Sequence, residues 1–435
     1  MDETLIKKAE DRIAYDAAHE PTIKKILGTV RDFIQKRRVL CYGGTAINNL
    51  LPPADQFYDR NYDIPDYDFY SEQPQLHAME LADTFHSQGF KSIEVKPGAH
   101  LLTFKVFVEF TGVADITYLD PAIFKRLWSE DIVKEGIHYV SPNFLRMSMY
   151  LELSRPRGDV SRWEKVYKRL MLLNKHYTVG CKPHSTSSEV VAVTDTEREA
   201  IEHTLQTKSV ILLGLHAADL HSRKRTNVWE VPIDILATPE TYETTVSLFT
   251  KIFESRNAKA HAHPAYAELL PEHTDIEGSN NFVYCRVFKT NACHSYHQLQ
   301  SGMKVASIPT LLQFFFAFVY ADAHMIEGYD QNRIICICQR LMDLAATTKR
   351  RYKLLTPLDC LGRQETLVDI KSHTADLRET LPKKSNEFLK LFFTYRPGSL
   401  NRTQKSRVRE SLKKTMKSSS LPIPSELVVD KLSTE

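Results

Sequence analysis

The chain has 435 residues, of which 42% are hydrophobic and 26% are charged, and its formal net charge is +3. These values are typical of a soluble globular protein, and the length predicts two or three domains with cores of their own. The charged first residues predict no signal peptide. The apolar window 308–321 is too short to span a bilayer, so we expect a buried helix there and no membrane partner.

Residues 2–37 predict helical structure interrupted near Pro21, because apolar residues recur at helical spacing between Ile23 and Ile34. The segment 40–45 then predicts a short apolar strand, a glycine turn and a helix from about Ala46. A glycine turn before a helix exposes backbone N–H groups that suit a phosphate. The candidate phosphate-binding residues are Gly43, Gly44 and Thr45.

An acidic segment follows a polar loop. Asp66 and Asp68 are separated by one residue, and two such carboxylates on a strand project to the same face. There they can share divalent cations, which prefer oxygen ligands. The alternative is an acidic surface loop, since Asp55, Asp59 and Asp63 lie just upstream. The apolar continuation of the strand after Asp68 argues against that alternative.

The next segments predict a helix over 75–87, a half-buried strand over 101–110 and a further strand over 113–117. Asp115 is a lone acid in that last strand, and its charge requires a compensating partner, which a metal ion would supply. We therefore predict that Asp66, Asp68 and Asp115 are catalytic residues that bind two divalent ions for nucleotidyl transfer. Asp120 is predicted to cap the following helix.

A basic helical segment is predicted over 141–174. Spacings of three and four place Arg162, Lys165 and Arg169 on one helical face. Such a face could hold nucleotide phosphates, and Lys165 and Lys168 are the predicted contacts, while an aromatic residue of this region, which contains Trp163 and Tyr167, could stack on a base. A solvated helix surface is the alternative.

The second half of the chain repeats the first at a nearly constant offset. Residues 210–218 resemble 39–47, and 231–236 resemble 64–69. Aligning Pro65 with Pro232 places Ile233 and Ile235 where Asp66 and Asp68 stand. The sequence therefore predicts a duplicated domain whose second copy has lost the metal-binding acids.

The seven cysteines are an odd number without framework spacing, which predicts reduced thiols in a cytosol-like compartment. Cys336 and Cys338 lie in an apolar segment and are predicted as buried core thiols. One stretch is rich in potential zinc ligands but lacks the tight paired spacings of structural zinc sites, so the sequence does not favour a metal site there. Its residues are His261, His263, His273, Cys285, Cys293, His294 and His297.

A basic run between Lys383 and Lys417 contains Phe392, Phe393 and Tyr395. Lysine and arginine neutralise phosphates, and aromatic rings stack on any base, so this region predicts a grip on single-stranded RNA. The alternative is a helix packed on the core with a solvated basic face. The tail 418–435 is predicted to be mobile.

Three motifs carry a resemblance to a known family: Tyr-Gly-Gly-Thr-Ala-Ile-Asn at 42–48, Ile-Pro-Asp-Tyr-Asp-Phe-Tyr-Ser at 64–71, and the segment 154–167. They resemble the poly(A) polymerase catalytic subunits of large nucleocytoplasmic DNA viruses, asfarvirus-like and mimivirus-like, of the polymerase-β-like nucleotidyltransferase superfamily. The resemblance implies an α/β (α+β) fold with two nucleotidyltransferase-like domains, the second degenerate, and helical flanks. It also implies template-independent transfer of AMP from ATP to an RNA 3′ end, with release of pyrophosphate.

By the same resemblance, Gly43, Gly44 and Thr45 contact the triphosphate, and the three acids bind Mg²⁺ or Mn²⁺. The implied partners are ATP and the single-stranded 3′ end of an RNA, with either a homodimer or a separate processivity subunit. The implied location is the host cytoplasm, in a viral factory, and the virion.

The expected domains are an N-terminal helical segment (1–37), a catalytic domain (38–190), a degenerate copy (191–330), a basic helical region (331–417) and the tail. Two other functions stay open. One is a nucleotidyltransferase for a small molecule or a signalling nucleotide, which would not need the basic C-terminal region. The other is a non-catalytic RNA-binding protein, which would not need the three acids.

Overall fold

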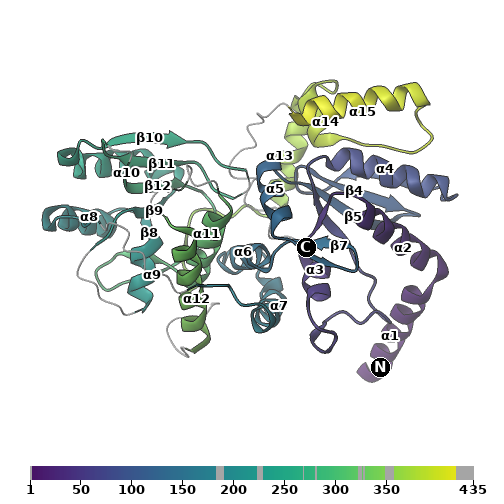
Figure 1. Cartoon of the computed structure of the whole chain (residues 1–435), viewed down its shortest axis with the longest axis horizontal. Helices are drawn as coiled ribbons and strands as arrows, with labels where there is room; N and C mark the ends of the chain where they lie inside the picture. The colour runs from purple at the N-terminus through teal and green to yellow at the C-terminus, as the bar shows by residue number, and fades with distance from the viewer. Residues whose placement is uncertain are drawn as a thin grey trace. The chain divides into compact units, whose positions relative to one another are not determined.

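The computed structural model describes residues 2–182, 191–222, 229–267, 269–279, 282–321, 326, 329–347 and 357–417 (Figure 1). They form two compact units. Unit 1 contains the described residues up to Ser141 and those from Leu367 onward, and unit 2 contains the described residues between Pro142 and Thr366. The tail predicted to be mobile, 418–435, lies outside the described residues.

Unit 1 begins with the helices α1 (Glu3–His19) and α2 (Pro21–Lys36), as predicted. Glu20 separates them, and its carboxylate accepts a hydrogen bond from the backbone N–H of Ile23 at 3.0 Å. Pro21 suits the first helical position, where its missing N–H costs nothing. The interruption near Pro21 is therefore a helix cap.

A seven-stranded mixed sheet forms the centre of unit 1. The pairs β2–β5 and β1–β7 are parallel, and the other neighbouring pairs of this sheet are antiparallel. The predicted strands and the helix over 75–87 are confirmed, except that the helix after the glycine turn already begins at Gly43. The spatial order is β3 (Ile93–Pro97), β4 (Thr103–Val108), β5 (Thr111–Tyr118), β2 (Asp68–Ser71), β1 (Leu40–Cys41), β7 (Ile137–Tyr139), β6 (Ile132–Lys134). The helices are α3 (Gly43–Leu50), α4 (Pro74–Ser87) and α5 (Pro121–Ser129), with the 3₁₀ turn Pro53–Asp55.

The C-terminal segment returns to unit 1 through α13 (Leu367–Thr380), α14 (Asn386–Phe392) and α15 (Arg402–Lys417). Tyr395 pairs with Val95 at the β3 edge, and its hydroxyl donates to Asp83 of α4 at 2.6 Å. Phe392 and Phe393 are buried as well as Tyr395. The expectation that these rings stack on bases is therefore wrong, because they belong to the core of unit 1.

Unit 2 contains an eight-stranded mixed sheet. Its spatial order is β10 (Lys259–His263), β11 (His273–Glu277), β12 (Val283–Lys289), β9 (Ile233–Ala237), β8 (Val210–Leu213), β14 (Lys304–Ala306), β13 (His294–Gln298), β15 (Cys360–Leu361). Its α-helices are α6 (Pro142–Leu153), α7 (Trp163–His176), α8 (Asp195–Thr207), α9 (Gly214–Ser222), α10 (Pro239–Ile252), α11 (Ile308–Tyr320) and α12 (Gln331–Thr347), and its 3₁₀ turns are Val160–Arg162 and Glu254–Arg256.

The apolar helix α11 is the core of unit 2, since every one of its residues is buried. The Tyr320 ring of α11 packs edge-on against Phe144 of α6, with ring centroids 5.1 Å apart. Phe316 of α11 stacks with Tyr150 of α6, with ring centroids 6.1 Å apart. This aromatic contact explains why the boundary between the units falls before Pro142, whereas the sequence placed it at 190. Among the described helices, none is long and apolar enough to cross a membrane.

The two sheets share one topology. The order β3-β4-β5-β2-β1-β7-β6 of unit 1 corresponds strand by strand to β10-β11-β12-β9-β8-β14-β13 of unit 2. The central pairs also agree in direction: β1–β2 and β8–β9 are antiparallel, while β2–β5 and β9–β12 are parallel. The chain therefore contains two copies of one sheet architecture.

Strand register corrects the predicted alignment of the copies by one residue. Gly43 and Gly214 have the same left-handed backbone, with φ of +72° in each, and both lie against a carboxylate. For Gly43 the carboxylate is Asp68, and for Gly214 it is Asp234. Asp234, and not Ile235, is therefore the counterpart of Asp68. The prolines misled the alignment because hydrogen-bonded register, and not the proline position, fixes which residues face each other.

The same register makes Arg286 the counterpart of Asp115, since Asp234 faces Arg286 as Asp68 faces Asp115. The Arg286 guanidinium binds both oxygens of Asp275, with Nε–Oδ1 at 2.6 Å and Nη2–Oδ2 at 2.7 Å, and its Nη1 lies 3.9 Å from Asp234 Oδ1. Tyr329 also donates a hydrogen bond to Asp234. The second copy thus holds a built-in cation where the first has an acid.

Two disulfides contradict the expectation of reduced thiols. Cys181 pairs with Cys336, and Cys293 pairs with Cys360. Their sequence separations are 155 and 67 residues, so no local spacing pattern reveals them. The remaining cysteines, Cys41, Cys285 and Cys338, are free and buried, which confirms the core assignment of Cys338 but not that of Cys336.

Replacing Arg286 with leucine should destabilise unit 2 by about 3–5 kcal/mol, because it leaves buried carboxylates without their cation. The free energy of unfolding from urea denaturation measures the effect. Arg333→Leu is the matched control: it removes a half-exposed pair with Glu230 at 2.7 Å and should cost no more than about 1 kcal/mol. Equal losses in the two variants would contradict the charge-compensating role of Arg286.

Candidate active site

Asp68 and Asp115 lie side by side on the parallel strands β2 and β5. They are direct register partners, and both are buried, with relative exposures of 4% and 3%. Neighbouring strands are about 4.8 Å apart, and register partners project to the same face, so the two carboxylates share one environment. The backbone N–H of Asp115 donates to the Tyr67 carbonyl at 3.0 Å, which extends this register to the residue before β2.

Asp66 was predicted on the strand, but it precedes β2 and its side chain reaches solvent. The Thr45 hydroxyl of α3 donates to the Asp66 carbonyl at 2.5 Å and fixes this segment. Partial removal from water raises the pKa of Asp66, and the negative charge of Asp115 raises it further, while Lys105 acts in the opposite direction. Asp66 is thus close enough to Asp115 for the two carboxylates to interact electrostatically, and its place in the metal site stays a prediction.

Gly43 is required by both conformation and space. Its φ of +72° lies in the left-handed region, which favours glycine. A Cβ atom at this position would lie 2.6 Å from Asp68 Oδ2, so any side chain would collide with the carboxylate. Asp68 therefore packs against the first turn of α3.

The start of α3 can still interact with an anion. No side chain caps this helix, and the first N–H groups of a helix favour phosphate. The predicted contacts Gly43, Gly44 and Thr45 all lie in this first turn. Because the hydroxyl of Thr45 is used by the Asp66 carbonyl, a phosphate contact of Thr45 is left to its backbone N–H.

Lys105 of β4 is a site residue that the sequence reasoning missed. Its ammonium lies 2.5 Å from Asp115 Oδ2, and it faces Asp115 in the β4–β5 register. The available signal was a single charged residue in the strand Thr103–Val108, which is otherwise apolar apart from its threonine. In unit 2 the equivalent pair is Asp275 and Arg286, so the charges of this cross-strand pair are exchanged between the copies.

A network of hydrogen-bonded hydroxyl groups lies beside the carboxylates on the same face of the sheet. The Tyr42 hydroxyl lies 2.9 Å from Thr117 Oγ1, and Thr117 Oγ1 lies 3.0 Å from Thr103 Oγ1. The Tyr42 ring stacks on Tyr70 with centroids 3.9 Å apart. Since Thr117 lies two residues after Asp115 on the same strand, this network shares the face of the acids and fixes it.

The donor set fits a hard divalent cation. The candidate donors are the three carboxylates of Asp66, Asp68 and Asp115, and Lys105 forms an ion pair with Asp115. Carboxylate oxygens are the ligands that Mg²⁺ and Mn²⁺ prefer, and the charge of a cation would offset the burial of two acids. The second copy supports this reasoning, because there an arginine supplies the positive charge from within the chain.

The predicted phosphate contacts Lys165 and Lys168 belong to α7 of unit 2. Lys168 forms an exposed pair with Glu164 at 2.6 Å. Lys165 is also exposed, and partial burial lowers its pKa, as do the neighbouring cations Arg169 and Arg162. A role for these lysines at the carboxylates stays a prediction.

The other residues of this basic segment have structural contacts. Arg162 pairs with Glu152 at 3.0 Å, and Arg169 is buried. Trp163 is buried too, and its indole N–H donates to the Glu152 carbonyl at 3.2 Å. Trp163 is therefore excluded as the base-stacking aromatic of this segment, while such a role for Tyr167 stays a prediction. Asp120 caps α5 as predicted, accepting from the Ala122 N–H at 2.9 Å.

A mixed sheet with two neighbouring strand carboxylates behind a glycine-led helix is the arrangement that the sequence predicts for nucleotidyl transfer. Residues 28–159 match the family model described as poly(A) polymerase catalytic subunit. This segment is therefore similar to the poly(A) polymerase catalytic subunit family, the family that the motifs resemble.

Viral proteins are among its relatives. A putative poly(A) polymerase catalytic subunit of Acanthamoeba polyphaga mimivirus is 33% identical over 182 residues, which cover 40% of this chain and 30% of that protein. One from African swine fever virus (isolate Tick/Malawi/Lil 20-1/1983) is 30% identical over 178 residues, covering 40% and 37%. The matched segment thus spans about a third of the length of these relatives.

The similarity of fold extends much further than the similarity of sequence. The structure of the Megavirus polyadenylate synthase superposes with a TM-score of 0.75 at 20% sequence identity. This superposition covers 94% of the present chain and 88% of that chain. The predicted α/β fold is confirmed over both units.

Replacing Gly43 with alanine should destabilise unit 1 by about 1–2 kcal/mol, because alanine is strained at positive φ. It should also weaken Mn²⁺ binding, measured by electron paramagnetic resonance, because the new Cβ displaces Asp68. Gly28→Ala is the control: it has no atom within 4 Å of its Cβ position and lies inside α2, where alanine is favoured by roughly 0.5–1 kcal/mol. Unchanged Mn²⁺ affinity in Gly43→Ala would contradict the close packing of helix and carboxylate.

Proposed function

We propose that this chain is a poly(A) polymerase that transfers AMP from ATP to the 3′ hydroxyl of an RNA, without a template. The observation that carries the proposal is the buried, side-by-side pair of Asp68 and Asp115 behind the first turn of α3, within the segment 28–159 that matches the model of this family. In the reaction, the RNA hydroxyl oxygen bonds to the α-phosphorus of ATP, and the bond from that phosphorus to pyrophosphate breaks.

Asp66 and Asp68 would hold both divalent ions, and Asp115 would serve the hydroxyl side of the site. When bound, two such ions lower the pKa of the attacking hydroxyl and neutralise the leaving pyrophosphate. Lys105 holds one oxygen of Asp115 and so fixes the orientation of this carboxylate, which accepts the hydroxyl proton. The backbone N–H groups at the start of α3 would bind the triphosphate.

RNA binding is proposed for the exposed cations of the C-terminal region of unit 1. With the aromatic residues in the core, the basic side chains that remain exposed between residues 383 and 417, among the described residues, carry this function. They are Lys383, Lys384, Arg396, Arg402, Arg407, Arg409 and Lys413. Arg396 and Arg409 also pair with Glu94 and Asp83. Attraction to phosphates is independent of base sequence, as the extension of a homopolymer requires.

Incubation with a labelled RNA primer, Mg²⁺ or Mn²⁺ and each nucleoside triphosphate singly should give long products with ATP alone. Asp68→Asn and Asp115→Asn should each reduce the rate at least about a thousandfold, since the lost stabilisation is several kcal/mol and each 1.36 kcal/mol is a factor of ten. Gel analysis of initial rates measures this.

Two control variants accompany that experiment. Asp59→Asn alters an exposed loop acid, and Asp234→Asn alters the counterpart of Asp68 in the second copy. Folded protein of both variants should extend primers at the rate of the unmodified chain. Primer extension that survives loss of Asp68 and Asp115 together, or no extension with any nucleotide, would refute the proposal.

Replacing Arg402, Arg407 and Lys413 of α15 together with alanine should weaken RNA binding and flatten its dependence on salt. Each lost phosphate contact reduces the slope of log K against log salt by about 0.7 on a single strand. Fluorescence anisotropy with a labelled oligonucleotide at several salt concentrations measures the slope. A control replaces the exposed Lys91, Lys208 and Lys251, and an equal change in both triple variants would argue against α15 as the contact.

A further inference from the structure

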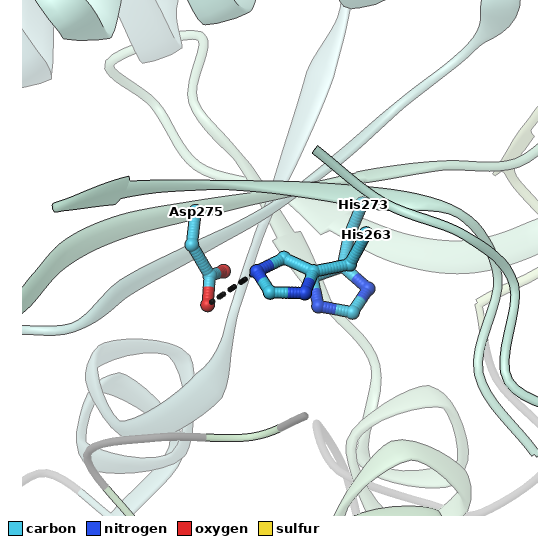
Figure 2. Close-up of side chains that lie close together, drawn as sticks. All are labelled: His263, His273 and Asp275. Carbon is cyan, nitrogen blue, oxygen red and sulfur yellow. Dashed lines mark ion pairs between the residues drawn. The ribbon is translucent and has the colours of Figure 1, made fainter. Parts of the chain in front are cut away.

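A cluster of potential metal ligands lies at the edge of the sheet in unit 2. The strand β10 is the edge strand, and it pairs in an antiparallel direction with β11. His263 faces His273 directly in this register, and Asp275 is two residues after His273. Side chains two residues apart on a strand share a face, so the three point to the same side, as Figure 2 shows.

The ligand atoms are close enough to share one ion. One nitrogen of each imidazole and one carboxylate oxygen of Asp275 all lie within 4.8 Å of one another. His263 Nε2 is 3.8 Å from Asp275 Oδ2 and 3.9 Å from Glu277 Oε1. Zinc ligands at bond lengths of about 2.0–2.2 Å are separated by roughly 3.3 Å in a tetrahedron, so a small rotation of the side chains completes the geometry.

Both imidazoles present a nitrogen without a hydrogen-bond partner. His273 is fully buried, yet its Nε2 has no hydrogen bond, and neither has the buried Nε2 of His263. The other nitrogen of His273, Nδ1, lies 3.3 Å from the Pro271 carbonyl. A hydrogen bond from Nδ1–H to that carbonyl leaves the lone pair of Nε2 for a metal, which is the usual arrangement of metal-bound histidine.

The surrounding charges favour a cation. Asp275, Asp234 and Glu277 are three carboxylates, and Arg286 is the cationic partner of Asp275 and Asp234. Arg286 binds both oxygens of Asp275, but a carboxylate has about four acceptor positions, so Asp275 can also bind a metal.

We propose that His263, His273 and Asp275 form a structural site for a zinc-type transition-metal ion, separate from the carboxylate site of unit 1. Two imidazoles with a carboxylate are a zinc ligand set, and Glu277 is placed to complete or support it. Such an ion would link the edge strand β10 to the buried strand β11, and it would protect an edge that is otherwise a template for unwanted pairing.

Sequence spacing did not reveal this site, because its ligands come from two strands that face each other across a hairpin. The other members of the Cys/His-rich stretch do not join it. Cys293 is in a disulfide, Cys285 is a buried thiol, and the side chain of His261 is 57% exposed and only reaches Glu277 at 4.0 Å.

The test uses the full chain treated with a chelator and then titrated with Zn²⁺, with excess Mg²⁺ present to occupy the carboxylates of unit 1. Competition with a chromophoric chelator gives the affinity, and Co²⁺ gives the absorption bands of a tetrahedral site. We expect saturable binding and a rise in the thermal midpoint. His263→Gln, at a half-exposed edge position, should weaken Zn²⁺ binding at least about tenfold and abolish the Co²⁺ bands.

His261→Gln is the matched control, because it alters the same strand two residues away and should leave the affinity within about threefold. Circular dichroism verifies that both variants are folded. Zn²⁺ binding that is unchanged in His263→Gln, or that falls equally in the two variants, would overturn the proposal. Primer extension does not enter this test, so its outcome is independent of the proposed enzymatic function.

Discussion

The parallel register of β2 and β5 is the constraint on which the site depends, because it places two acids at adjacent buried positions. Two like charges removed from water on neighbouring strands destabilise a fold unless positive charge compensates them. Lys105 supplies part of that charge from the next strand. Gly43 lets the start of α3 approach Asp68, and Thr45 fixes the backbone of Asp66. Each of these features follows from the need to hold carboxylates together.

The second copy keeps the register and resolves the charge problem within the chain. Asp234 keeps the position of Asp68, while Arg286 replaces the acid at the position of Asp115 and Asp275 replaces Lys105. A guanidinium that is hydrogen-bonded to both oxygens of Asp275 and lies 3.9 Å from Asp234 supplies the positive charge at the positions that correspond to Asp68 and Asp115. The same sheet architecture therefore differs in charge between the two units. In unit 1 two buried acids face each other, and in unit 2 an acid faces Arg286.

Local patterns in the sequence predicted the elements and the acids, since strand alternation, the glycine turn and the isolated Asp115 are properties of short segments. Three features were not predicted, and for a common reason. The role of Lys105, the correspondence of Asp234 to Asp68 and the disulfide pairing all depend on contacts between distant segments. Strand register decides which residues face each other, and it is set by the whole sheet. The aromatic residues around Phe393 illustrate another limit, because composition does not distinguish a ring in the core from a ring that stacks on a base.

The C-terminal segment makes unit 1 discontinuous in sequence, with the described residues of unit 2 inserted between Ser141 and Leu367. Lys405 reaches back to Asp83 at 2.8 Å across 322 residues, and Tyr395 pairs with Val95. During synthesis unit 2 can therefore fold before unit 1 is complete. The side of β3 and α4 that α14 and α15 cover stays exposed until these helices have left the ribosome. The order of assembly is thus written into the connectivity: the unit that carries the acids is the first to begin and the last to close.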